Sequence, residues 1–173
     1  VIVVWEDHRD EYTQNATAWN MKIYGHRIDL SNGTLDPVWS SNPDGVVVSA
    51  YTDGNAHAPR ITCTGSGAYI AWTDFRNAGY HTGAYHNSDV YLTYFESATA
   101  APPPQNCSGV ASYAQHGNPV TLDTNDQRNP ELALDNLRRV YCLTVGGGQQ
   151  TVLQLGATIV FEDNRIINGS LGV

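Results

Sequence analysis

Apolar residues occur along the chain in short runs that are rich in β-branched and aromatic side chains. These runs cover residues 1–5, 22–29, 46–49, 58–62, 68–71, 89–95, 119–122, 129–134 and 140–145. No window has a sustained apolar period of about 3.6 residues, which a helix needs in order to bury one face. The pattern therefore predicts an all-β fold with almost no helix.

Two of these runs end in the same short sequence, W-x-D-x-R, and the two tryptophans are 67 residues apart. A tyrosine follows each tryptophan by 19 residues, inside the next apolar run. The shared residues are Trp5, Asp7, Arg9 and Tyr24 in the first segment and Trp72, Asp74, Arg76 and Tyr91 in the second. A fixed period of this length indicates repeated structural units.

The repeat continues in two further strands. Runs 46–49 and 119–122 predict a third strand, and runs 58–62 and 129–134 predict a fourth, which a proline opens. Pro59 precedes Trp72 by 13 residues and Pro130 precedes Leu143 by 13, so we expect Leu143 at the tryptophan position of a third unit. Phe161 fits either another corner or, by its offset, the second strand of that unit, which we favour.

Four short strands in each unit are typical of a β-propeller blade. We therefore predict one β-propeller segment over residues 1–173, with approximate units 1–67, 68–138 and 139–173. About two and a half blades of four antiparallel strands form an incomplete ring, because a ring needs at least about four. The strand at 1–5 and the residues after Thr151 are then open edges, which we expect further blades or another chain to cover.

The W-x-D-x-R corner, the I-Y-x-x-R-I-D-x-x-N-G-T strand and the proline-led strand resemble the tandem repeats of secreted bacterial surface proteins. The resemblance is good from Trp5 to Trp72 and weaker beyond. It implies a β-propeller inside a long exported protein with adhesion or surface-assembly modules. His26 and Leu143 depart from the family pattern, where Gln and Trp are usual.

Charge and hydropathy exclude two classes of partner. The chain has 17 acidic and 9 basic side chains and a net charge of −8, so it has no electrostatic basis for a nucleic-acid track. No apolar run approaches the roughly 20 residues that span a bilayer, so we expect no membrane insertion. Residues 1–5 resemble a strand from the middle of a protein and not a signal peptide, which suggests a piece of something longer.

Cysteines and sequons bear on the compartment. Cys63, Cys107 and Cys142 allow one disulfide with one free thiol, or three buried free thiols, which we favour. Sequons that are compatible with a glycosylated exterior begin at Asn15, Asn32, Asn106 and Asn168. Both features fit an extracellular or cell-surface protein.

The recurrent Asp-x-Arg pairs favour structure over catalysis, because catalysis seldom needs one copy per blade. We expect the tryptophan to pack between blades while the ion pair ties the end of its strand. The alternative is a sialidase-like glycan hydrolase, whose arginine triad would be Arg9, Arg76 and Arg165. The S-x-D-x-G-x-T-W sequence of that family is missing.

Other candidate sites are weaker. Asp53, Asp123 and Asp126 offer oxygen ligands for calcium, although Asx turns explain them equally simply. No other cofactor is expected. The loop with Tyr80, His81, Tyr85 and His86 has the side chains that bind sugars or protein partners.

Together these patterns predict a non-enzymatic extracellular scaffold or binding module that acts in adhesion or assembly. No residue is assigned a catalytic role. The expected partners are other protein chains or further blades of the same protein, and glycans.

Overall fold

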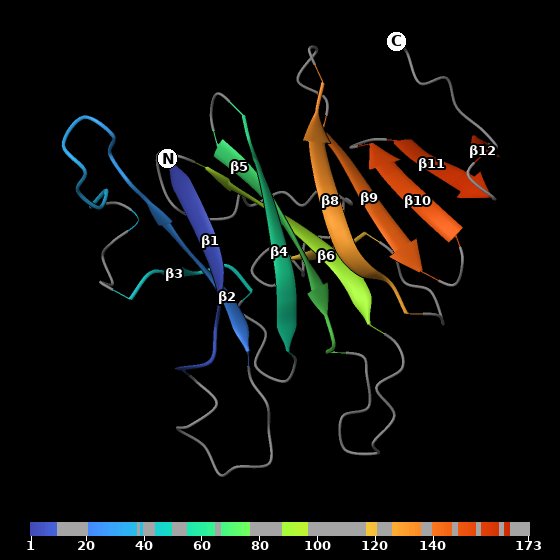
Figure 1. Ribbon diagram of the computed structural model, residues 1–173, viewed down its shortest axis with the longest axis horizontal. Helices are drawn as coiled ribbons and strands as arrows, with labels where there is room; N and C mark the ends of the chain where they lie inside the picture. Colours follow the sequence, from blue (N-terminus) through green and yellow to red (C-terminus); the bar gives the residue numbers. More distant parts are fainter. Residues whose placement is uncertain are drawn as a thin grey trace.

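The computed structural model describes residues 1–9, 21–37, 39, 44–49, 55–64, 67–76, 88–96, 117–120, 126–135, 140–146, 149–154, 157–162 and 165–166. Within these ranges the protein consists of antiparallel strands and contains no α-helix, which confirms the all-β prediction. The strands form three sheets, which lie beside one another across Figure 1.

The first sheet has three strands in the order β1 (Ile2–Asp7), β2 (Lys22–Arg27) and β3 (Val46–Val47). Trp5 on β1 lies opposite Tyr24 on β2, and Tyr24 lies opposite Val47 on β3. The amide and carbonyl of Val1 both bond with those of Ile28, at 2.8 and 2.7 Å. This pair fixes the alternation of hydrogen bonds along β1.

The second sheet has four strands in the order β4 (Ala56–Cys63), β5 (Gly67–Asp74), β6 (Asp89–Glu96) and β7 (Asn118–Pro119). Trp72 on β5 lies opposite Tyr91 on β6, and Tyr91 lies opposite Pro119 on β7. The cross-strand register around Trp72 is therefore that around Trp5, with one strand added beyond β5.

The third sheet has five strands in the order β8 (Arg128–Leu134), β9 (Val140–Gly146), β10 (Gln149–Gln154), β11 (Ala157–Glu162) and β12 (Arg165–Ile166). The second strand beside β9 is β10, and β11, which contains Phe161, pairs with β10 instead. The preferred assignment of Phe161 to the second strand is therefore wrong.

The proline-led strands β4 and β8 pair with the strand that follows them in the chain, β5 and β9. Each of these two sheets therefore begins one strand earlier than the sequence units 68–138 and 139–173 do. Register also places Thr144, and not Leu143, at the tryptophan position. His57 pairs with Thr73 and Arg128 with Val145, while Arg60 pairs with Ala71 and Glu131 with Leu143.

Two apolar cores hold neighbouring sheets together. The first core lies between the first and second sheets and contains Ile23, Trp39, Val48, Ala56, Ile70, Trp72, Tyr91 and Phe95. The second lies between the second and third sheets and contains Ala71, Val90, Leu92 and Cys142. Ile70 and Ala71 are adjacent on β5, and strand side chains alternate between faces, so the middle sheet is buried on both faces.

The outer strands β1 and β12 do not pair with each other, and the described ranges form no closed ring. The chain is shown as stacked antiparallel sheets, and the propeller assignment stays a prediction. The cysteine prediction needs one correction, because Cys63 is an exposed free thiol. Cys142 is a buried free thiol, and Cys107 lies outside the described residues.

Candidate functional site: the tryptophan corners

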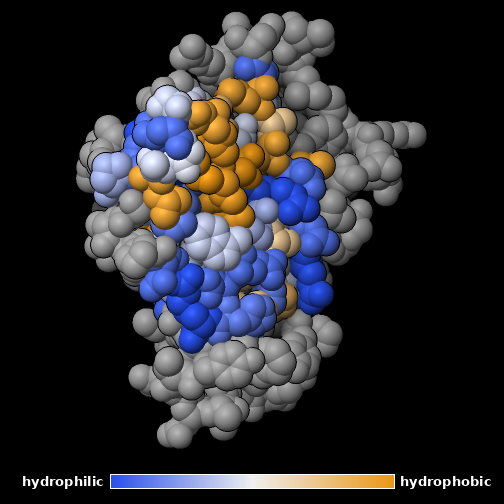
Figure 2. Space-filling model, turned by 60° about the vertical axis from the view of Figure 1, so that its left-hand side comes forward, coloured by the Kyte–Doolittle hydropathy of each residue, from blue (hydrophilic) through white to orange (hydrophobic). Residues whose placement is uncertain are grey.

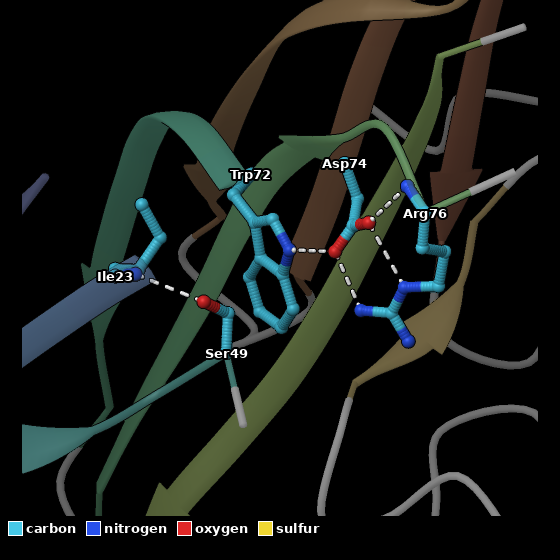
Figure 3. Close-up of polar contacts among 5 residues, drawn as sticks. All are labelled: Ile23, Ser49, Trp72, Asp74 and Arg76. Carbon is cyan, nitrogen blue, oxygen red and sulfur yellow. Dashed lines mark hydrogen bonds and ion pairs between the residues drawn. The ribbon is translucent and has the colours of Figure 1, made fainter. Parts of the chain in front are cut away.

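The corner at the end of β5 joins three side chains around one carboxylate. The indole N–H of Trp72 donates to Asp74 Oδ2 at 2.8 Å (Figure 3). Asp74 Oδ1 accepts from the backbone N–H and the Nε of Arg76 at 2.9 Å each, and Oδ2 accepts from Nη2 at 2.5 Å. The guanidinium lies 3.8 Å from the centre of the Tyr91 ring. The ion pair is almost completely shielded from water, with exposed fractions of 4% for Arg76 and 2% for Asp74.

The corner at the end of β1 has the same contacts. The indole N–H of Trp5 donates to Asp7 Oδ2 at 3.0 Å, and the backbone N–H of Arg9 donates to Asp7 Oδ1 at 2.9 Å. The Arg9 guanidinium also donates to Asp7 Oδ2 and lies 4.2 Å from the centre of the Tyr24 ring. Trp5 is half-buried, whereas Trp72 is fully buried.

The charges of the first corner depend on each other. The hydrogen bond from the Arg9 guanidinium holds the pKa of Asp7 well below its usual range, and the Trp5 indole adds to this effect. The same bond raises the pKa of Arg9. The corner therefore contains a carboxylate that is already bonded by its own strand, and this is a structural tie rather than a general base.

Each corner is closed by a glycine that the sequence analysis missed. Gly45 and Gly117 have φ angles of +97° and +79°, where side chains are strained. A Cβ atom would lie 2.8 Å from Cη2 of Trp5 at the first position and 2.4 Å from Cη2 of Trp72 at the second. The available signal was a glycine directly before the third strand of each unit.

A bulge at each proline-led strand ties one sheet to the next. Ala58 and Asn129, each directly before a proline, have φ angles of +51° and +52°, and the strand register shifts at both places. The Ala58 amide donates to Glu6 Oε1 at 2.7 Å, and the Asn129 amide donates to Thr73 Oγ1 at 3.0 Å. Glu6 and Thr73 each follow a corner tryptophan, so the same position accepts the bond in both sheets.

A second tie is also present twice. The Met21 amide donates to Asn55 Oδ1 at 2.8 Å, and the Ser88 amide donates to Asp126 Oδ1 at 3.0 Å. Asp126 also pairs with Arg128 at 2.8 Å. This calcium candidate therefore joins two strands, and no cluster of three acidic, His or Cys side chains occurs among the described residues.

Several predicted site residues fall outside the described part of the chain: Asp53, Asp123, Tyr80, His81, Tyr85, His86, Asn15, Asn106 and Asn168. Asn32 is described, and it is exposed in a turn, where its Oδ1 accepts from the amide and the hydroxyl of Thr34 at 2.9 and 2.7 Å. Arg165 lies on β12.

The sequence matches no protein-family model, and no curated protein matches it. In the described ranges no helix is long and apolar enough to cross a membrane.

Proposed function

We propose that the chain is a segment of a β-propeller-type repeat protein that acts as a non-enzymatic extracellular or cell-surface scaffold in adhesion or assembly. One observation carries this proposal: the Trp, Asp, Arg, Tyr and Gly contacts of the corner are the same in two neighbouring sheets. A copy in each sheet suits a structural role, because every sheet needs the end of its strand fixed while a reaction needs one centre.

The chemistry of the corners supports binding over catalysis. Asp74 and Arg76 are buried and bonded to each other, and Asp7 and Arg9 form the same pair. In the sialidase-like alternative, arginines converge on one substrate carboxylate. Arg9 and Arg76 instead lie in different sheets and each covers the ring of a tyrosine in its own sheet. The scaffold is therefore the better account.

The extracellular location and the partners belong to the same proposal. The exposed Asn32 in a sequon supports a glycosylated exterior. The net charge of −8 argues against nucleic acid as a partner. The partners are further blades, other protein chains or glycans, and no cofactor is required, although calcium in a loop is compatible with the sequence.

A panel of fluorogenic glycosides, including sialosides, tests the proposal against the enzyme alternative. We expect no turnover above a blank with heat-denatured protein. Turnover by the native chain that is lost in Arg76→Ala, with Arg60→Ala as the control, would overturn the scaffold proposal. Circular dichroism of both variants separates loss of activity from loss of fold.

A further inference from the structure

The strand β1 has one hydrogen-bonding edge that no strand occupies within the described residues. Val1 exchanges both backbone bonds with Ile28, so the odd-numbered residues of β1 face β2. The amides and carbonyls of Ile2, Val4 and Glu6 therefore point to the opposite edge. There β1 is the outer strand of its sheet.

The equivalent edge is occupied in the other two sheets. On β5, Tyr69, Ala71 and Thr73 stand where Ile2, Val4 and Glu6 stand on β1. These three residues pair with Thr62, Arg60 and His57 of β4. The edge of β9 is covered in the same way by β8. Both covering strands carry a proline after a residue with positive φ.

One face of the first sheet is also open. Val1 and Val3 have exposed fractions of 56% and 41%, whereas the equivalent Ala68 and Ile70 of the second sheet are at 0%. Ile2 and Val4 point the other way and pack against the first core. Figure 2 brings this side of the molecule forward and shows a patch of apolar atoms in its upper half. The chain's own second sheet shows what a covered version of this face looks like.

We infer that the free edge of β1 and the adjoining Val1–Val3 face bind a partner strand of the β8 kind. The partner is an extended, proline-containing segment that pairs antiparallel with β1. This inference rests on the proposed scaffold function and names its partner. Backbone bonds to Ile2, Val4 and Glu6 supply affinity, since strand addition at an open edge is a common mode of peptide binding. The apolar side chains of the partner cover Val3.

The experiment uses a synthetic peptide with the sequence of residues 127–135, QRNPELALD, and the full chain. Fluorescence anisotropy of the labelled peptide measures binding, and a peptide of the same composition in scrambled order is the control. We expect saturable binding of the first peptide only. Equal binding of both peptides, or of neither, would overturn the inference.

Two variants locate the binding site. Val4→Pro removes an amide that faces the open edge and no amide that faces β2, so the sheet keeps its hydrogen bonds. We expect it to weaken binding at least about 5-fold. Val3→Lys places a charge on the open face and is expected to weaken binding about 10-fold. Leu30→Lys is the matched control, because Leu30 is an exposed apolar residue outside β1, and it should bind as the parent does.

The outcomes separate the competing explanations. Undiminished binding by Val3→Lys shows that the peptide binds elsewhere, for example in place of β8, and overturns the inference. If Val4→Pro loses its circular dichroism signal, the comparison of Val3→Lys with Leu30→Lys decides alone. Dimerisation of the free chain that Val3→Lys abolishes would make a second copy the occupant and would also overturn it. Absence of glycoside turnover together with absence of peptide binding refutes this inference but leaves the scaffold proposal standing.

Discussion

Replacing Gly117 with alanine tests how tightly the corner is built. The new methyl group would lie 2.4 Å from Cη2 of Trp72, whose side chain is fully buried. The φ angle of +79° adds a cost of about 1–2 kcal/mol for an L residue. Overpacking of a closed core adds about 1–3 kcal/mol. We therefore expect a loss of about 2–5 kcal/mol, a large share of the roughly 5–15 kcal/mol that stabilises a domain.

Urea unfolding followed by tryptophan fluorescence measures this loss. The control is Gly33→Ala, because Gly33 has a similar φ of +71° but no atom within 4 Å of a Cβ. Gly33→Ala should lose only the backbone part, about 1–2 kcal/mol. The excess loss in Gly117→Ala then reports the clash with Trp72.

A double mutant separates the clash from the backbone strain. When Trp72 is replaced by Leu, the alanine at 117 no longer meets a ring. The two substitutions should then be coupled by about 1–3 kcal/mol. If Gly117→Ala costs no more than Gly33→Ala, or if the double mutant is additive, the proposed contact does not determine the stability of the corner.

Three further predictions concern the charges, the thiols and the ties between sheets. Asp7→Asn should destabilise the protein at neutral pH, and the difference from the parent should shrink as the pH falls below about 4. The reason is that Arg9 lowers the pKa of the native Asp7 carboxylate, whose contribution is lost on protonation; urea titrations at several pH values measure it. In a Cys107→Ser background, Ellman's reagent should modify one thiol of the native chain, Cys63, and a second only on unfolding. Burial raises the pKa of Cys142 to about 12, so native labelling of two thiols would contradict the fold. Thr73→Val should cost about 1–3 kcal/mol, because it leaves the Asn129 amide without its acceptor, and Thr73→Ser should cost clearly less.

The sequence predicted most strands because their apolar runs are short and β-branched, and it placed Trp5 and Trp72 at strand ends. It could not predict which neighbour β4 joins, since pairing depends on tertiary packing. It also missed β10, because Gln149–Gln154 contains three glutamines and only two apolar residues. That omission led to the wrong strand assignment for Phe161.

The tryptophan position of the third sheet shows a different limit. Counting from Pro130 selects Leu143, but register selects Thr144. The connection between paired residues runs from 64 to 67 before β5 and from 135 to 139 before β9, so it is one residue longer in the third sheet. An insertion in a hairpin leaves the apolar pattern intact while it moves each later residue by one position. The glycines before β3 and β7 were visible in the sequence, but their contact with the tryptophan rings was not.

The ties at the bulges make the order of the sheets part of the sequence. The first junction uses the carboxylate of Glu6 for the Ala58 amide, and the second uses the hydroxyl of Thr73 for the Asn129 amide. Arg60 on β4 also pairs with Glu131 at the equivalent place on β8, at 3.1 Å. A copy of β4 in place of β8 would set Arg60 against another arginine. Each sheet therefore accepts a particular neighbour, and duplication or exchange of units during evolution requires compensating changes at these few positions.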